Sequence, residues 1–299
     1  MLSRPRRPSL HDKGTLKGTL MRRFFLCLCL FGLSSHAVAA DLDWPLRGPA
    51  RPSPSVQQWG GLYAGGQVGY STAGSNFQNS VNDLAAEVVR NTFLESIVTN
   101  LATLSGANTN GIGYGGFFGY NSYWEGAVLG VEVNYSRTSL NVGASDSIPP
   151  LLVSNDAGAP AGHHFVYGVN LTGNANLRIT DLATFRARGG WAAGRFMPYA
   201  FFGVAVARAD VSRSATVSWV RTDLPDDPLV VPIPPASGGG TKAEVQNGGF
   251  YYGYAGGLGM DVFLMPNVFV RGEWEYVGMP IQSMHVNINT VRAAVGVKF

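Results

Sequence analysis

The chain has 299 residues, of which 39 are glycine and only 14% carry a charge, a composition that is unusual for a soluble globular domain. Its formal net charge is +3, but seven of the 22 lysines and arginines precede residue 41, which leaves 15 basic and 18 acidic residues beyond that point. A net charge of −3 over residues 41–299 gives no basic stripe that could follow phosphates, so nucleic acid is excluded as a partner.

The first segment with a recognisable pattern is the N-terminal 40 residues. Met21, Arg22 and Arg23 precede an apolar run from Phe24 to Leu33, and the small residues of 37–40 follow. This order is typical of a secretory signal peptide, and the apolar run is too short to span a bilayer. We therefore predict that residues 1–40 are a leader and signal peptide that is removed, with Met21 as the preferred initiator.

The next segment, residues 41–58, contains four prolines and no core pattern, which predicts a stiff, Pro-rich periplasmic linker. Cys27 and Cys29 both lie in the predicted signal, so the mature chain has no cysteine for disulfide or thiolate chemistry. Beyond residue 40 no run of 18 apolar residues occurs. The exported chain is therefore either soluble or inserted as a closed barrel, because a bilayer admits only helices and closed barrels.

Eight segments from residue 61 onward alternate apolar with polar or small residues at a period of two, as strands do. In the last of them, Val291, Val295 and Val297 alternate with Arg292 and Lys298. The predicted strands cover residues 61–73, 111–123, 127–141, 169–193, 198–219, 249–264, 268–278 and 286–299. Each can cross a bilayer at the tilt of barrel strands, which takes about 9–11 residues.

The connections between these strands alternate in length. Tight turns fall at 124–126, 194–196 and 265–267, whereas the intervening connections cover 74–110, 142–168, 220–248 and, more briefly, 279–285. Short turns at one rim and long loops at the other are typical of outer-membrane barrels. Residues 59–299 are therefore predicted to form an all-β, eight-stranded antiparallel up-and-down transmembrane β-barrel with short periplasmic turns and long outer loops.

Aromatic residues gather near the ends of the predicted strands, as in the two interfacial girdles of a barrel. Those near the short turns are Trp59, Tyr63, Tyr123, Trp124, Trp191, Phe196, Tyr199, Phe263, Phe269 and Phe299. Those nearer the long loops are Tyr70, Trp219, Tyr251, Tyr252 and Tyr276. We expect both sets to lie at the membrane surfaces.

If the apolar faces contact lipid, the polar faces meet in a lumen that carries charges of both signs. These lumen residues are Glu132, Arg186, Arg188, Arg271, Glu273, Glu275, Arg292 and Lys298. Counting from the short turns predicts an ion pair between Glu132 and Arg188, and another between Arg292 and Glu273 or Glu275. The charges can line a permeation path or fill the lumen as a plug, and the narrow interior of an eight-stranded barrel favours the plug.

Two of the long connections carry patterns of their own. The first has apolar residues spaced by three or four, which predicts a helix that either packs as a lid over the barrel mouth or rests on the bilayer or a partner. These residues are Ala85, Val89, Phe93, Ile97, Leu101 and Leu104. The third connection is Pro-rich and is expected to be mobile. Its acids, Asp223, Asp226 and Asp227, lack any recognised calcium-site spacing.

Histidine is the residue most often used for catalysis or metal binding, and only His163, His164 and His285 follow the predicted signal. All three fall in or beside loops, and none can be placed beside both a nucleophile and an acid. Haem capture by the two adjacent histidines lacks a supporting ligand set. We therefore predict that the protein is not an enzyme and has no catalytic, cofactor or metal site.

Several short motifs occur in a recognisable order. They are WGGLYAGGQVGY at 59–70, GGFFGYN at 115–121, LGVE at 129–132, FRARGGW at 185–191 and VGVKF at 295–299. With them the chain resembles the small OmpA-type barrels of Gram-negative outer membranes, particularly the porin-like, opacity and surface-antigen proteins with a single barrel domain. The resemblance implies an outer-membrane location among lipid and lipopolysaccharide. It also implies assembly by periplasmic chaperones and by the barrel-insertion machinery, which would read Phe299 as the insertion signal.

Function is not fixed by this fold, and three hypotheses remain. The first is a non-enzymatic structural or surface-antigen protein with limited porin activity. The second is a true diffusion porin for small solutes. The third is a receptor whose first three loops bind haem or a host-surface ligand.

Overall fold

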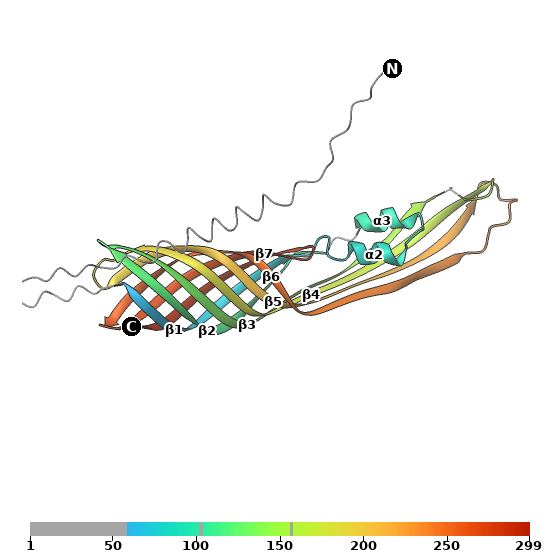
Figure 1. Cartoon of the computed structure of the whole chain (residues 1–299). Helices are drawn as coiled ribbons and strands as arrows, with labels where there is room; N and C mark the ends of the chain where they lie inside the picture. The colour runs from blue at the N-terminus through green and yellow to red at the C-terminus, as the bar shows by residue number, and fades with distance from the viewer. Residues whose placement is uncertain (1–58, 102–103, 156–157) are drawn as a thin grey trace, which may run out of the picture. The chain divides into compact units, whose positions relative to one another are not determined.

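The computed structural model describes residues 59–101, 104–155 and 158–299, so the predicted signal peptide and linker lie outside the described residues. Eight strands close into a barrel in sequence order, each antiparallel to its neighbours, with the first paired to the last (Figure 1). They are β1 (Gly61–Asn76), β2 (Ala107–Trp124), β3 (Ala127–Ser154), β4 (His163–Trp191), β5 (Phe196–Pro225), β6 (Ala236–Met265), β7 (Val268–Ile281) and β8 (Met284–Lys298). The predicted fold class is confirmed.

The faces of the strands follow the predicted alternation. On β3, Val131 is 62% exposed whereas the adjacent Glu132 is 2% exposed. On β8, Val291 and Val295 likewise point outward while Arg292 is buried. The barrel wall thus presents apolar side chains outside and polar ones inside, because a strand sends successive side chains to opposite faces. As for helices, none in the described ranges is both long and apolar enough to cross a membrane.

Strands β3 to β6 continue far beyond their predicted ends. The pairing of β2 with β3 stops at Tyr114 and Arg137, and that of β6 with β7 at Tyr254 and Gly278. Beyond these points β3 to β6 remain paired with one another as a four-stranded sheet (Figure 1), which we call the distal sheet. It comprises residues 138–154, 163–180, 209–225 and 236–253. The prediction that 142–168 and 220–248 are long loops was therefore wrong, and only 155–162 and 226–235 are connections.

Two short helices, α2 (Asn82–Val88) and α3 (Leu94–Leu101), stand in place of the single predicted helix. Asn91 adopts a φ of 63° between them and interrupts the helical backbone. The helices lie along the distal sheet (Figure 1), and Ala85, Val89 and Val98 are buried against its inner face. The apolar side of the helices thus packs on protein, as predicted for a lid. The surface that it covers is the distal sheet, whereas the prediction placed it over the barrel mouth.

Polar contacts tie the helical segment to the same face. Arg213 on β5 donates to the backbone oxygen of Ser80 at 2.6 Å and lies 3.2 Å from the carboxylate of Asp83. Lys242 on β6 pairs with Glu87 at 3.0 Å. Since the two anchors come from neighbouring strands, they fix α2 across the sheet.

The aromatic girdle near the short turns was predicted only partly correctly. Trp124, Trp191, Phe196 and Phe299 are exposed on the outside of the barrel. The interior instead holds Trp59, Tyr63, Tyr199, Phe263 and Phe269, all of them buried. These five side chains point into the barrel. The prediction used only their position near a strand end, which does not tell whether a side chain faces the lumen or the lipid.

The inward aromatics explain why several strand positions are glycine. A Cβ atom built on Gly119 would lie 2.3 Å from the hydroxyl oxygen of Tyr63, and one on Gly259 would lie 2.4 Å from the ring of Tyr199. Each ring therefore covers a glycine of a nearby strand, because the interior has no room for two side chains at the same height. Glycine here makes space for the interior packing.

We expect Gly119→Ala to lower the free energy of unfolding by about 1–3 kcal/mol, the usual cost of overpacking a filled core. The new Cβ would also lie 2.8 Å from the backbone oxygen of Val131, which cannot move aside easily. The measurement is the urea midpoint of refolded protein in detergent micelles. Gly272→Ala is the matched control, because a Cβ on Gly272 meets nothing within 4 Å. Equal midpoints for the two variants would contradict the packing argument.

Candidate functional site: the barrel interior

The short-turn end of the interior is closed by rings, which we call the aromatic layer. The rings of Trp59 and Phe263 lie 4.0 Å apart, and Phe263 meets Phe269 edge to face at 6.1 Å. Tyr63 and Phe117 also approach Phe269, at 6.0 and 6.2 Å. All five side chains are buried, so this end of the lumen has no open passage between the described side chains.

Directly against the aromatic layer lies a network of charges centred on Glu132. Its carboxylate accepts hydrogen bonds from Tyr63 Oη at 2.7 Å, Arg271 Nη1 at 2.9 Å and Arg188 Nη1 at 3.1 Å, and it also pairs with Arg186. The predicted contact between Glu132 and Arg188 is present. Three arginines share this one carboxylate, whereas the sequence predicted only one of them as its partner.

The second predicted contact is present in both of its alternatives. Arg292 pairs with Glu275 and lies 3.5 Å from Glu273. Arg186 also reaches Glu273 at 2.8 Å and Glu275 at 3.0 Å. Because Arg186 contacts Glu132 as well, it joins the two predicted pairs into one network.

Asp261 is the member of the network that the sequence reasoning missed. It accepts from Arg188 Nη2 at 2.7 Å and from Arg271 Nε at 2.7 Å. The signal was available, because the outward residues Leu258 and Met260 alternate with Gly257, Gly259 and Asp261 on the inward face of β6. Extending that alternation by one step places a carboxylate in the lumen.

With Asp261 included, the network balances its charge. It contains the cations Arg186, Arg188, Arg271 and Arg292 and the anions Glu132, Asp261, Glu273 and Glu275. Every one of them is at most 4% exposed. Buried charges are tolerated only when they are paired and hydrogen-bonded, and mutual pairing meets that requirement. Lys298 shares the inward face of β8 but lies nearer the rim and is only partly buried.

Three of the arginines also stack on aromatic rings of the barrel interior. The guanidinium carbon of Arg188 lies 3.8 Å from the ring centre of Tyr199, that of Arg186 4.2 Å from Phe201, and that of Arg271 4.3 Å from Phe117. A guanidinium stacks on aromatic faces while its edge binds carboxylates. The aromatic layer and the charge network therefore pack as one unit.

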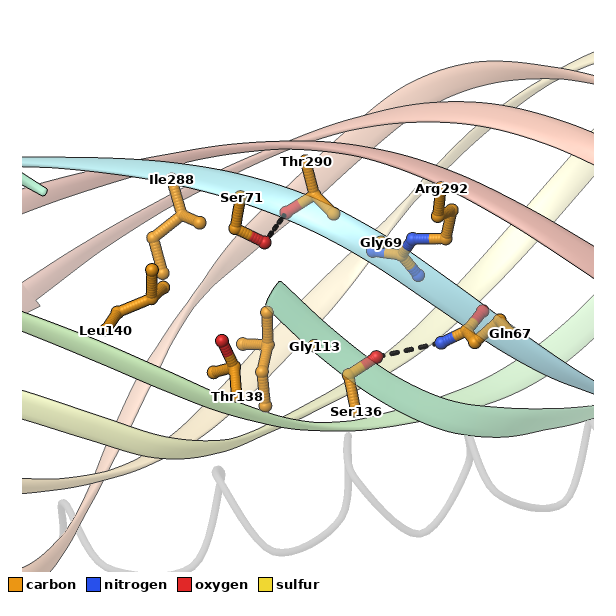
Figure 2. Close-up of a pocket in the computed structure, with 11 residues that line it drawn as sticks. Gln67, Gly69, Ser71, Gly113, Ser136, Thr138, Leu140, Ile288, Thr290 and Arg292 are labelled. Atoms are coloured by element: carbon orange, nitrogen blue, oxygen red, sulfur yellow. Dashed lines mark hydrogen bonds between the residues drawn. The ribbon is translucent and has the colours of Figure 1, made fainter. Parts of the chain in front are cut away.

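Beyond the network lies a small polar cavity (Figure 2) of about 20 Å³. Around it Gln67 Nε2 donates to Ser136 Oγ at 2.8 Å, and the hydroxyls of Ser71 and Thr290 lie 2.8 Å apart. Arg292 also lines it. A space of this size holds a water molecule and is too small for a sugar or an amino acid.

The other end of the cavity is closed by an apolar layer. Leu140, Leu182 and Ile288 line the cavity, and beyond them Ile179 and Met279 are fully buried. This layer is continuous with the core beneath α2 and α3. The interior is thus filled in succession by rings, charges, one small cavity and aliphatic side chains.

The histidines lie outside the barrel interior. His163 Nδ1 is 2.6 Å from Asp223 Oδ2, which also accepts from the backbone N–H of Ile233 at 2.8 Å. Burial acts to raise the pKa of Asp223, but these hydrogen bonds hold it below its usual value. His164 pairs with Asp226, so both adjacent histidines have an acid beside them, which the sequence did not indicate.

The remaining candidate residues are dispersed. His285 is exposed on β8, and Asp227 accepts from the backbone N–H of Leu229 at 2.9 Å. Among the described residues no group of three or more His, Cys, Asp or Glu side chains could hold a metal ion. The charged interior is therefore the main concentration of ionisable groups in this part of the chain.

A closed ring of eight antiparallel strands with an apolar outside and a polar inside defines a transmembrane β-barrel. The chain matches the family described as "Outer membrane protein beta-barrel domain" over residues 25–299, and it belongs to that family. The protein is therefore located in the bacterial outer membrane, among its lipids.

Solved structures with a similar chain course include three outer-membrane proteins. Neisserial surface protein A is 12% identical with a TM-score of 0.36, and the match covers 80% of this chain and 97% of that one. Ail of Yersinia pestis is 10% identical with a TM-score of 0.33, covering 80% and 99%. OprG of Pseudomonas aeruginosa is 11% identical with a TM-score of 0.31, covering 82% and 99%. A search of curated protein sequences gives no match.

Proposed function

We propose that this protein is a non-conducting, non-enzymatic outer-membrane barrel that holds the distal sheet outside the cell as a surface platform. The observation that carries the proposal is the filled interior, in which eight buried charges neutralise one another. This is a structural and surface-antigen role in which the barrel serves as an anchor.

The diffusion-porin hypothesis has less support. A permeating ion would have to displace Arg186 from three carboxylates, and the cavity beyond the network measures about 20 Å³. Porins with an aqueous channel use larger barrels. The receptor hypothesis is the stronger second candidate, because β3 to β6 form a folded sheet where flexible loops were expected.

Assembly is part of the same proposal. Phe299 follows the end of β8 and is 76% exposed, so its ring is accessible as a recognition element for the insertion machinery and for periplasmic chaperones. Surrounding lipid and lipopolysaccharide are the permanent partners of the apolar wall.

Conductance in planar bilayers tests the closed lumen. We expect residues 41–299 to give no current steps. Glu132→Ala combined with Arg188→Ala should stay silent as well, because the aromatic layer and the apolar layer still close the two ends of the lumen. The double variant removes one charge of each sign from the network and leaves three of each, so it opens space without creating net charge.

The matched control is Glu87→Ala combined with Lys242→Ala, which removes an ion pair on the distal sheet and should remain silent. Discrete steps from the unaltered protein would overturn the proposal and favour the porin. A silent protein would support it, and steps from the lumen variant alone would show that the charges, and not the two layers, close the lumen.

A further inference from the structure

A hollow of about 300 Å³ lies on the face of the distal sheet that points away from α2 and α3. Its lining residues come from three strands and include Gly143, Ser145, Asn174, Asn176, Ser212 and Ser214. The alternate residues Leu177 and Val211 are buried on the opposite face with the helices. The hollow is therefore on the outward surface, which continues the outside of the barrel wall.

The strand register arranges these six positions as a grid. One row across the sheet is Ser145, Asn174 and Ser214, and the next is Gly143, Asn176 and Ser212. Neighbouring strands lie about 4.8 Å apart, so the polar groups are evenly spaced. Gly143 keeps its corner open, because a Cβ there would lie 3.1 Å from Asn176 Nδ2.

The polar groups of the hollow are not used within the protein. In the adjacent row the hydroxyls bond to each other, Ser147 with Thr172 at 3.2 Å and Thr216 with Thr241 at 2.9 Å. The five polar side chains of the hollow, in contrast, make no side-chain hydrogen bond to any other described residue. Two amides and three hydroxyls thus offer donors and acceptors together in one place.

The chemistry of the hollow selects a class of ligand. None of its lining residues is charged, so neither an anion nor a cation would find a counter-charge there. Free amides and hydroxyls at regular spacing match the hydroxyl groups of a sugar. We propose that this hollow binds the neutral sugars of the lipopolysaccharide around the barrel, an inference that rests on the proposed function of the distal sheet as an outside platform.

The order of side chains along the outward face argues for lipopolysaccharide as the occupant. Nearest the barrel lies the apolar, lipid-facing wall, with Phe185 and Val204 exposed. Next come the exposed arginines Arg137, Arg178 and Arg208, and then the neutral hollow. Lipopolysaccharide presents acyl chains, phosphates and sugars in this same order, so the face is complementary to one molecule along its length.

The arginines of this face are available to a phosphate. No hydrogen bond or ion pair joins the guanidiniums of Arg137, Arg178 or Arg208 to another described side chain. The strand register places Asp181 opposite Arg137 and Arg208, and Asp210 opposite Arg178. These acids also accept hydrogen bonds, Asp181 from Tyr135 Oη at 2.6 Å and Asp210 from Gly248 N–H at 2.7 Å, and the three arginines outnumber the two acids. Guanidinium groups are well suited to phosphate oxygens.

The test uses the full mature chain in phospholipid nanodiscs. Its two probes are the lipid-free polysaccharide released from smooth lipopolysaccharide and lipid A alone. We expect saturable binding of the polysaccharide by calorimetry. Asn174→Ala with Asn176→Ala should weaken it about tenfold, as expected for losing one to two hydrogen bonds. Thr216→Ala with Thr241→Ala, a pair one row away, is the matched control and should leave the affinity unchanged.

Gly143→Val provides a second arm that removes no polar group. Its side chain fills the open corner and suits a strand, so polysaccharide binding should fall although every amide and hydroxyl remains. Undiminished binding in both variants, or binding of lipid A without the polysaccharide, would overturn the sugar site. This result is separate from conductance, since a conducting barrel would refute the closed lumen without changing what the hollow binds.

Discussion

Replacing Glu132 by alanine is expected to lower the free energy of unfolding by about 3–5 kcal/mol, the cost of breaking a buried ion pair from one side. Glu132 is the shared acceptor of Arg186, Arg188 and Arg271, and it also accepts from Tyr63 Oη. Its removal leaves the interior with four arginines and three carboxylates. The surplus charge cannot reach bulk water, because the aromatic layer and the apolar layer close both ends.

Urea unfolding in lipid vesicles, followed by tryptophan fluorescence and by the change in gel mobility on unfolding, measures this effect. Glu132→Ala with Arg188→Ala restores neutrality, so the double variant should be more stable than the sum of the two single losses predicts. Glu87→Ala on the exposed surface should cost less than about 1 kcal/mol, as surface pairs do. A near-normal midpoint for Glu132→Ala would mean that water enters the lumen and solvates the arginines.

The barrel itself could be predicted because its wall has a strong and simple signal. Bulky apolar residues such as Val131 and Leu129 alternate with Glu132, and the short turns after β2, β4 and β6 separate the strands cleanly. The same alternation identifies the residues that face the lumen. It does not identify all their partners, because Arg186 pairs with acids on both β3 and β7, and the sequence does not show which strands face each other across the lumen.

The distal sheet could not be predicted for a physical reason. Outside the membrane an outward strand position need not be apolar, so Asn174, Asn176 and Ser212 replace the large lipid-facing residues and the alternation resembles that of a loop. The inner positions, such as Leu177 and Val211, do remain apolar. Their partners are α2 and α3, which lie far away in the sequence, and only the three-dimensional packing identifies them.

The docking of these helices supports a second large prediction. Val98 lies on α3 and is fully buried within the core shared with the distal sheet. Val98→Asp places a carboxylate there, and an unpaired charge in an apolar site costs several kcal/mol. We expect the helices to leave the sheet, because that exposes the carboxylate to water at a lower cost than keeping it buried. The barrel should remain folded, since the rings of its interior form a cluster separate from that of α3 and the charge network packs on those rings.

Amide hydrogen exchange in nanodiscs separates these two outcomes. Exchange in α2, α3 and β5 beyond residue 209 should accelerate at least about tenfold, which corresponds to about 1.4 kcal/mol of lost local stability, while β1, β7 and β8 keep their protection. Ser96→Asp, on the exposed side of the same helix, is the matched control. Uniform acceleration throughout the barrel would show that sheet and barrel unfold together. Acceleration confined to the helices and the distal sheet would mean that the distal sheet can unfold while the barrel stays folded in the membrane.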